Sequence, residues 1–305
     1  MVGGKDMSLF HKKTFGEKVF DVCNYTLLTL IALICLYPML YVLFSSVSDP
    51  LQLMKFRGFL YKPLGFTLKG YEVLLHNPNI PIGYLNTIFY VVIGTCLNLF
   101  VTMLGAYALS RTGYKLKKLF TIAIVFTMYF GGGMIPNFLL VRNIGLINTR
   151  WALVLPTLIG TWNMIVMRTI FAAVPKSLEE SAKMDGANDF VVLFKIFIPV
   201  SKATIAVMLL FYAVGHWNSW FNAMIYLRDR QLWPLQLFMR EIIIANTMIG
   251  NETGTVSGEA GQGFFYLEEV IKYATIIVST VPILCIYPFI QKYFTKGIML
   301  GSLKG

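Results

Sequence analysis

Four acidic residues lie within eleven positions of an otherwise apolar sequence, at Glu179, Glu180, Asp185 and Asp189. Carboxylates so close together could serve acid–base chemistry. A membrane enzyme, however, would need a pair of acids or a Ser–His pair inside its membrane-spanning segments. These acids lie between apolar runs, the three histidines are scattered, and no GxSxG motif is present. The acidic stretch therefore does not predict an enzyme.

The cysteines predict no site either. Cys23, Cys35, Cys96 and Cys285 lie in or beside apolar runs; none forms a CxxC pair, and none is near a histidine. Buried, inert thiols are the expected state, with no metal site and no disulfide framework.

Composition points to a membrane protein. The 305 residues are 56% hydrophobic and 13% charged, and the mean hydropathy is +0.66. A soluble protein carries about 25% charged residues. In a soluble protein, the net charge of +11 would suggest nucleic-acid binding. In a membrane protein, Lys and Arg gather on the cytoplasmic side, so the charge is first tested as a signal of orientation. No cleavable signal is evident, because the first apolar run is too long for a signal peptide and predicts a retained anchor.

Six apolar runs are each long enough to cross a bilayer, which takes about 20 residues per helix. Three contain helix breakers, among them Pro38 and the Gly131–Gly133 triplet. Breakers at membrane depth are tolerated where neighbouring helices satisfy the freed backbone groups. We therefore expect an all-α bundle packed around a pathway. The expected spans are Tyr25–Val47, Asn86–Leu109, Leu119–Leu140, Trp151–Phe171, Ala203–Tyr226 and Tyr273–Phe294.

Positive charge indicates the orientation. With both ends inside, the inner segments, counted with Arg168 and Lys292, hold 16 of the 26 Lys and Arg and 7 of the 15 acids. The outer segments hold the other 10 basic and 8 acidic residues. The positive-inside rule then places both termini in the cytoplasm. The expected parts are an N-terminal segment 1–24, a transmembrane domain 25–294 with inner connection 172–202 and outer connection 227–269, and a tail 295–305.

The acidic stretch lies in the inner connection and has the local signals of two short helices. Ser177 and Glu180 have the spacing of a capping box, and Gly186 is a natural helix stop. Asn188 or Asp189 could cap the second helix. Periodicity alone allows either an amphipathic connector on the inner membrane surface or a docking element for a cytoplasmic partner.

The spacing of this stretch resembles the EAA loop of bacterial ABC importer permeases. In that motif EAA, three residues, Gly and nine residues precede Ile-x-Leu-Pro; here Glu180-Ser181-Ala182, Gly186 and Ile196–Pro199 take these places. Ser181 replaces Ala and Ile198 replaces Leu, so each residue stays small or aliphatic. Other segments are similar to carbohydrate importers of the maltose-transporter type, in particular the second, shorter permease. These are Asn86–Tyr90, Gly105–Arg111, Gly145–Pro156 and Gln291–Gly305, with Met128–Pro136 and Trp162–Phe171 closest to Lpl-type permeases of oligosaccharides and polysaccharide fragments.

The resemblance implies a type I importer permease of the bacterial cytoplasmic membrane that does not hydrolyse ATP itself. Implied partners are a second homologous permease, two copies of an ABC ATPase, an extracytoplasmic solute-binding protein, the saccharide and membrane lipid. ATP and Mg²⁺ would bind the ATPase, so no cofactor, metal or nucleic acid is expected on this chain. The expected ATPase contacts are Glu180, Ser181, Ala182, Asp185, Gly186, Ala187, Ile196 and Pro199.

The fifth expected span offers candidates for the substrate pathway. Asn218 and Asn222 are four residues apart and would share a helix face beside aromatic rings. Amides and rings suit sugars, but the same residue types also join membrane helices, and His216 is expected to be a packing residue. The pathway candidates are Asn218, Asn222, Trp217, Ser219 and, in the fourth span, Asn163.

The outer connection contains a Gly- and Glu-rich segment, Gly250–Gly263, that predicts a mobile loop. The resemblance suggests contact with the binding protein, and a plain spacer is equally compatible. The candidates are Gly250, Glu252, Gly254, Gly258 and Gly261.

Two other classes remain as alternatives. An ion-coupled secondary transporter would show ionisable residues inside its spans and inverted repeats, and neither is evident. A multispan membrane enzyme would need the catalytic groups that the spans do not supply.

Overall fold

The computed structural model describes residues 14–111, 115–252, 270–286 and 288, with the backbone alone for 245–252. These residues are mostly helical, and their one extended pairing is an isolated bridge between Ser48 and Phe66. The expected all-α class is confirmed.

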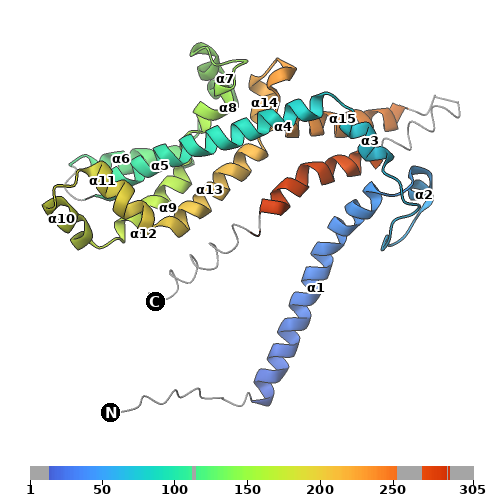
Figure 1. Ribbon diagram of the computed structural model, residues 1–305, viewed down its shortest axis with the longest axis horizontal. Helices are drawn as coiled ribbons and strands as arrows, with labels where there is room; N and C mark the ends of the chain where they lie inside the picture. The colour runs from blue at the N-terminus through green and yellow to red at the C-terminus, as the bar shows by residue number, and fades with distance from the viewer. Residues whose placement is uncertain (1–13, 112–114, 253–269, 287, 289–305) are drawn as a thin grey trace.

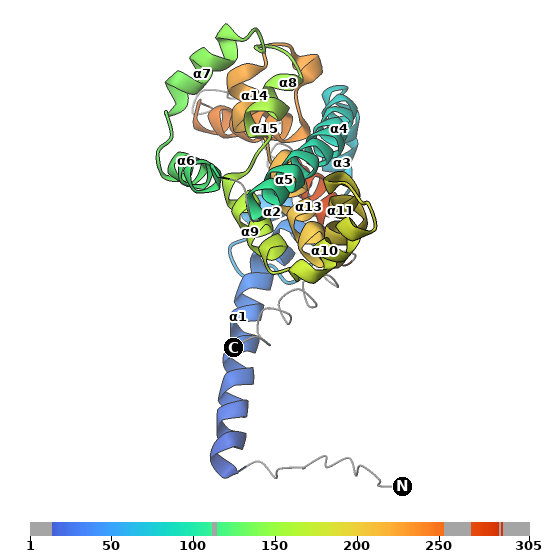
Figure 2. The ribbon, with the colours of Figure 1, turned by 90° about the vertical axis from the view of Figure 1, so that its left-hand side faces the viewer.

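Helix α1 (Phe15–Ser46) stands away from the rest of the molecule (Figures 1 and 2). A capping box of Thr14 and Glu17 starts it ten residues before the expected span, and Pro38 lies inside it without ending it. Its apolar section has no buried residue, and only Ser45 and Ser46 at its end are buried. The expectation that every span packs into one bundle is therefore wrong for α1 within this single chain.

Two short helices follow, α2 (Pro50–Lys55) and α3 (Lys69–Leu75). A small apolar cluster formed by Leu53, Leu60 and Val270 joins this region to the start of the last described helix, Val270–Ile286. That helix returns from the α3 end of the body toward its opposite end (Figure 1).

The body is built on one long helix. α4 (Asn79–Phe89), the π-helical turn η1 (Tyr90–Gly94) and α5 (Thr95–Ser110) run without interruption. α5 packs against α9 (Thr161–Ala172) and α13 (Lys202–Trp217) around a core that includes Met167, Phe171 and Met208. The second expected span, Asn86–Leu109, lies inside this helix.

Two of the expected spans are bent, and a third bend lies just before the expected span Ala203–Tyr226. α6 (Lys117–Tyr129) and α7 (Met134–Asn143) meet at 117°, because the Gly131–Gly133 segment breaks the helix and Gly133 has φ +84°. α8 (Trp151–Val154) with the 3₁₀ turn η2 (Leu155–Thr157) meets α9 at 48°. The described residues thus hold two long apolar helices, three bent pairs and the shorter helix Val270–Ile286, not six straight spans.

The third bent pair begins at Asp189, the last residue of the acidic stretch. α10 (Lys176–Met184) precedes it, and α11 (Asp189–Val192), the π-turn η3 (Leu193–Phe197) and α12 (Ile198–Val200) then meet α13 at 88°. α10 and α11 occupy one end of the body, at the left of Figure 1.

The outer connection is more ordered than expected. After α14 (Phe221–Tyr226) and the 3₁₀ turn η4 (Arg230–Leu232), the 18-residue helix α15 (Leu235–Glu252) packs along α4. Leu235 and Phe238 are buried there, and the Leu235 amide donates to Thr87 Oγ1 at 2.8 Å. Hence 227–269 is not one long loop.

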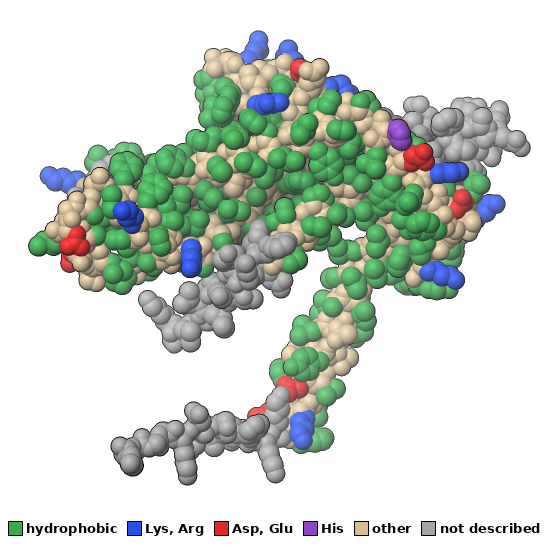
Figure 3. Space-filling view, viewed as in Figure 1, with side chains coloured by type: hydrophobic (Ala, Val, Ile, Leu, Met, Phe, Trp, Pro, Cys, Tyr) green, Lys and Arg blue, Asp and Glu red, His purple; other side chains and the backbone are tan. Residues whose placement is uncertain are grey.

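Hydrophobic side chains cover the middle of the body, and charged ones gather at its left and right ends and at the top (Figure 3). The cysteines follow this pattern: Cys23, Cys35, Cys96 and Cys285 are exposed in the isolated chain, so the expectation of buried thiols is wrong. Their surroundings are apolar surface instead of core.

Candidate functional site

Helix α10 ends at a glycine whose backbone geometry defines the turn into α11. Gly186 has φ +82°, and its amide donates to Lys183 O at 3.0 Å, while the Ala187 amide donates to Ala182 O at 2.9 Å. Together these two bonds form a Schellman motif, which satisfies carbonyl groups at the helix end. The predicted stop at Gly186 is confirmed.

The N-terminal signals of the two helices have different outcomes. Asn188 caps α11, since its side chain accepts from the Val191 amide at 2.9 Å. The predicted capping box of Ser177 and Glu180 is wrong, because α10 already begins at Lys176 after Pro175 and has no side-chain cap. Ser177 lies within the first helical turn, where it cannot be the cap.

The turn exposes one face and buries little of the other. Ala182, Ala187 and Ile196 are half-buried against the core of α5, α9 and α13. Met184 is 88% exposed and Phe190 is 63% exposed. The remaining predicted contacts, Glu180, Ser181, Asp185, Gly186 and Pro199, are also exposed. The α10–α11 turn therefore presents a polar surface with apolar side chains at one end of the body.

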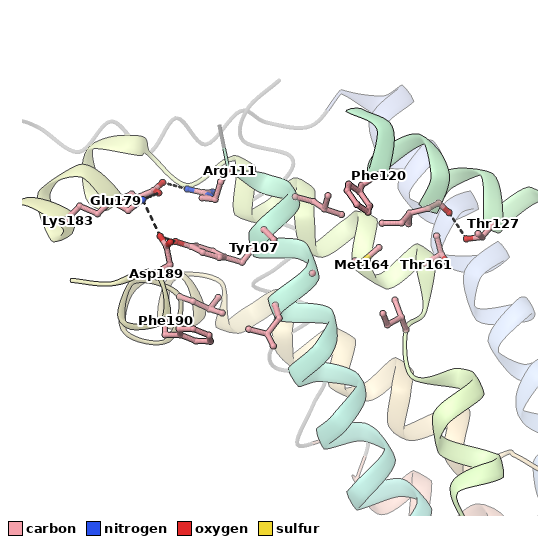
Figure 4. A pocket seen from close by; sticks show the side chains of 17 residues that line it. Tyr107, Arg111, Phe120, Thr127, Thr161, Met164, Glu179, Lys183, Asp189 and Phe190 are labelled. Atoms are coloured by element: carbon pink, nitrogen blue, oxygen red, sulfur yellow. Dashed lines mark hydrogen bonds and ion pairs between the residues drawn. The ribbon is translucent and has the colours of Figure 1, made fainter. Parts of the chain in front are cut away.

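A network of charges attaches this turn to α5 (Figure 4). Arg111, at the end of α5, pairs with Glu179, which also binds Lys183 Nζ at 2.9 Å. Lys183 Nζ lies 3.2 Å from Asp189 Oδ1, and the Tyr107 hydroxyl donates to the same oxygen at 3.2 Å. The chain of contacts starts and ends on α5.

The network changes the acidity of two of its members. Burial raises the pKa of Glu179, but hydrogen bonds from Lys183 and Arg111 outweigh it, so the pKa lies below its usual value. Hydrogen bonds to Glu179 and Asp189 raise the pKa of Lys183. Both groups are therefore held in their charged forms at neutral pH.

A cavity of about 900 Å³ opens beside this network, between α5, α6 and α9. Its walls are mostly apolar, with Phe120 and Met164 at one end and Arg111 and Glu179 at the other (Figure 4). The four charged side chains that line it all have partners within the network.

A second cavity, of about 390 Å³, lies where α13 ends. Its polar lining has no acid, Lys or Arg and consists of Thr157, Tyr212, His216, Asn218, Ser219 and Asn222. Hydroxyl and amide groups of this kind form directional hydrogen bonds with uncharged polar ligands. The site suits recognition of hydroxyl groups and lacks an obvious acid–base pair.

His216 lines this cavity and contacts Asn98 of α5. The Asn98 amide nitrogen donates to Thr157 O at 2.6 Å and Leu158 O at 2.8 Å, so its oxygen faces His216 Nε2 at 2.7 Å. That oxygen can only accept, and Nε2 therefore carries a proton. Gly94 permits the approach, because an added Cβ would lie 2.6 Å from His216 Cε1. His216 is a buried packing residue, as predicted.

Comparison with known proteins decides the family. The model of the "Binding-protein-dependent transport system inner membrane component" matches residues 119–223, which include the α10–α11 turn and the residues that line the second cavity. The "Polygalacturonan/rhamnogalacturonan transport system permease protein YtcP" of Bacillus subtilis is 41% identical over 95% of this chain and 99% of its own. The chain belongs to this permease family. Protein LplC of the same organism is 40% identical to this permease, over 96% of this chain and 97% of its own.

A solved structure agrees with this result. One chain of a bacterial ABC transporter involved in the import of the acidic polysaccharide alginate superposes on this permease with a TM-score of 0.82. The identity is 34%, over 92% of this chain and 99% of the other. The permease therefore has the ABC importer permease fold, and it is a membrane-embedded subunit of a transporter.

The structure separates the predicted pathway residues of the permease into two groups. Asn218, Ser219 and Asn222 line the second cavity, whereas Trp217 is buried and donates to Ser279 O at 3.2 Å. Asn163 does not line that cavity.

The reason given for pairing Asn218 with Asn222 is wrong, because the helix breaks between them. α13 ends at Trp217, and Asn218 Nδ2 donates back to Val214 O at 3.0 Å. The two amides therefore reach one cavity from two helices and not from one helix face.

The predicted binding-protein loop is described only at its start. Gly250 and Glu252 belong to the last turn of α15 and not to a loop, whereas Gly254, Gly258 and Gly261 lie outside the described residues. The same is true of the C-terminal tail 295–305 and of residues 1–13.

Sequence reasoning missed the residues that hold the turn in place. The sequence pointed to Arg111 only as the end of the Gly105–Arg111 segment, to Glu179 only as a member of the acidic stretch, and to Asp189 only as a member of that stretch and a possible helix cap. Glu179 and Lys183 have the i, i+4 spacing of a helical ion pair, which was a usable signal. Arg111 and Glu179 are 68 positions apart, and no local pattern links them.

Proposed function

We propose that this permease is one of two membrane subunits of an ATP-driven importer of oligosaccharides, and that its α10–α11 turn docks into a cytoplasmic ATPase. The observation that carries the proposal is this turn itself. It is fixed by the Schellman motif and the Asn188 cap, it is exposed on its outer face, and it is joined by charges to α5. ATP and Mg²⁺ then bind the ATPase and not this chain.

The second permease is supported by α1. This helix is 32 residues long, and the apolar section that follows its charged first turns is unburied. Apolar surface of that extent requires lipid or a protein partner. A homologous but different permease would cover part of it, and an extracytoplasmic solute-binding protein would deliver substrate to the pair.

Six membrane crossings with both termini in the cytoplasm fit the course of the chain. α1 and the long helix Asn79–Ser110 supply two, and the α6, α9 and α13 segments and Val270–Ile286 supply four. The Lys and Arg excess of the inner segments supports this orientation. It places the α10–α11 turn inside and α15 outside, in the cytoplasmic membrane of a bacterium.

Fragments of acidic polysaccharides are the substrate class that the relatives favour. The name of YtcP gives polygalacturonan and rhamnogalacturonan, and the alginate importer takes another acidic polymer. Asn218, Ser219 and Asn222 would contact sugar hydroxyls in the second cavity. The Gly250–Gly263 segment would reach the binding protein from the outer side; deleting residues 253–263 should then abolish delivery by the binding protein, and unimpaired uptake would leave it a spacer.

Co-purification tests the assembly. The tagged chain, expressed in its own host and extracted in mild detergent, should retain an ABC ATPase and a second permease. Replacing Glu180 and Gly186 together, by Gln and Val, should release the ATPase, while Asn163→Ala should not. A chain that purifies alone, or that keeps the ATPase after the double change, contradicts docking through this turn.

Cysteine labelling tests the orientation. In a variant whose four cysteines are serine, Met184→Cys should react with an impermeant maleimide only in inside-out vesicles. Asn77→Cys, after α3, should react only in intact cells. The reverse pattern contradicts the proposed topology.

Uptake tests the pathway. Asn222→Ala and Asn218→Ala should lower uptake of labelled oligogalacturonides, whereas Asn163→Ala, which is outside the cavity lining, serves as the matched control. Equal uptake by all three variants would show that this cavity is not part of the pathway. If the wild-type importer prefers neutral maltooligosaccharides to oligogalacturonides, the proposed acidic substrate class is wrong.

A further inference from the structure

Arg111 contacts three of the helices that meet at the α10 end of the body. Its Nη1 pairs with Glu179 of α10, and Nη2 donates to Phe171 O, near the end of α9, at 2.8 Å. Its Nε donates to Ser110 Oγ, on α5, at 3.0 Å. One side chain therefore joins the ends of α5, α9 and α10.

The same guanidinium also lies over two aromatic rings. Its carbon lies 4.3 Å from the centroid of the Phe197 ring and 5.3 Å from that of Tyr107. Phe197 is fully buried in η3, the π-turn that leads into α12. The hydrogen-bond partners and the two rings together fix the orientation of Arg111, which the point charge of a lysine could not reproduce.

The contacts continue through α10 and α11 and return to α5. Glu179 holds Lys183, Lys183 holds Asp189, and Asp189 accepts from Tyr107, one turn before Arg111. The side chains of Arg111 and Glu179 are each 15% exposed, so their pair is shielded from water far better than a surface pair.

Apolar packing contributes little to the attachment of α10. None of its nine residues is buried, and only Ala182 contributes to the core. Ions and hydrogen bonds must therefore carry most of the connection between α10 and the body. A displacement applied to α10 would reach α5 and α9 through Arg111 before it reached them through packed side chains.

We propose that Arg111 is the positioning residue that transmits movement of α10 to α5 and α9, and so couples ATP hydrolysis to opening of the pathway. This inference rests on the proposed function, because it requires an ATPase bound at the α10–α11 turn. It adds a specific residue outside the turn. Without this residue, the ATPase should still dock, but its ATP hydrolysis should no longer drive transport efficiently.

The test uses the whole complex with its binding protein, reconstituted in lipid vesicles. Three quantities are measured for each variant: the ATPase that co-purifies, the ATP hydrolysed and the labelled oligosaccharide taken up. Arg111→Lys keeps the positive charge but loses the planar set of guanidinium donors, and Arg111→Met loses both. Glu179→Gln keeps the shape of the Glu179 side chain, the partner of Arg111, but removes its negative charge. Arg168 provides the control, since its Nε donates to Leu109 O of α5 and the described contacts do not extend to α10.

For Arg111→Lys and Glu179→Gln we expect an unchanged amount of bound ATPase and continued hydrolysis. Uptake per ATP hydrolysed should fall by about fivefold or more, a coupling of the size expected between directly interacting residues. The double variant should fall no further than the more affected single one, because both remove the same connection. Arg168→Lys should stay within about twofold of the wild type.

Several results would overturn the proposal. Uptake per ATP within twofold of the wild type in Arg111→Lys and Glu179→Gln would show that α10 moves the spans without Arg111. If uptake falls only in proportion to the ATPase lost from the complex, Arg111 serves assembly and not coupling. If the losses of the two single variants add up in the double variant, Arg111 and Glu179 act independently. If Arg111→Met does not accumulate, the two milder variants decide. A wild-type complex with no ATPase, by contrast, refutes the proposed function.

Discussion

Replacement of Gly186 separates backbone geometry from partner contact at the α10–α11 turn. Gly186 has φ +82°, and a Cβ added there would meet no atom within 4 Å. A side chain is therefore not excluded by crowding within this chain. The cost lies in the backbone, since left-handed geometry costs an L-residue about 1–2 kcal/mol, less for Asn and more for a β-branched residue.

The amide of Ala187 reports this cost directly. It donates to Ala182 O at 2.9 Å, and that bond exists only while Gly186 keeps its left-handed conformation. A cost of about 1–2 kcal/mol raises the fraction of opened turns about 5- to 30-fold. Hydrogen exchange at Ala187 should accelerate by that factor in Gly186→Ala, by less in Gly186→Asn and by more in Gly186→Val.

Uptake should decline in the same order, with Gly186→Val abolishing transport while membrane insertion is unaffected. Gly145→Val is the matched control: Gly145 also has a positive φ, of +74°, and open space around it, but it follows α7, away from α10. It should leave exchange at Ala187 unchanged. If Gly186→Asn reduces uptake as much as Gly186→Val while Gly186→Ala is mild, size against the ATPase matters and the backbone argument is wrong. Normal uptake by Gly186→Val would refute force transmission through the turn.

Three further predictions concern the body and the charge network. Gly94→Ala should lower the thermal midpoint, at a cost of about 1–3 kcal/mol, because the added carbon overlaps His216, while Gly131→Ala, which meets no atom within 4 Å, should not. Asn98→Ala should cost about 2 kcal/mol or more, because it leaves two carbonyl groups and His216 without their partner; an unchanged midpoint would contradict that account. The pKa of Glu179 is lowered from 4.5, so its stabilising contribution is complete above pH 4.5 and is lost as pH falls through the lower folded value. The stability difference between wild type and Glu179→Gln should therefore be constant at neutral pH and shrink below pH 4.5; a difference that grows in acid would contradict the ion pair.

The parts of the site that could be predicted are those determined by neighbouring residues. Gly186 as a helix stop and Asn188 as a cap both follow from the preference of one residue type for one backbone position. The capping box failed for an equally local reason. Pro175 already occupies the N-cap position, with a non-helical ψ of 132°, and so α10 begins two residues too early for Ser177 to be the cap.

Breaks in the spans were predictable only where a breaker is present. The Gly131–Gly133 triplet signalled the 117° bend between α6 and α7. The break at Asn218–Trp220 has no Gly or Pro among its residues, and instead the Asn218 side chain bonds back to Val214 O. α15 was missed because a search for spans of about 20 apolar residues ignores a helix with a polar face.

The helical period places the acids of the stretch on two different faces of the turn. This division explains why so apolar a chain keeps them. Glu179 and Lys183 are four residues apart, share the face of α10 that looks toward α5, and meet Arg111 and Asp189 there. Glu180 is rotated by one position and is exposed, as is Asp185. The inner face of the turn is polar because ion pairs attach it to α5. These ion pairs can move together with α10 without disrupting the hydrophobic core. The outer face is polar because it meets water until a partner covers it. A purely apolar connector would lie flat on the membrane, and it could neither project from the body nor transmit a displacement to α5 and α9.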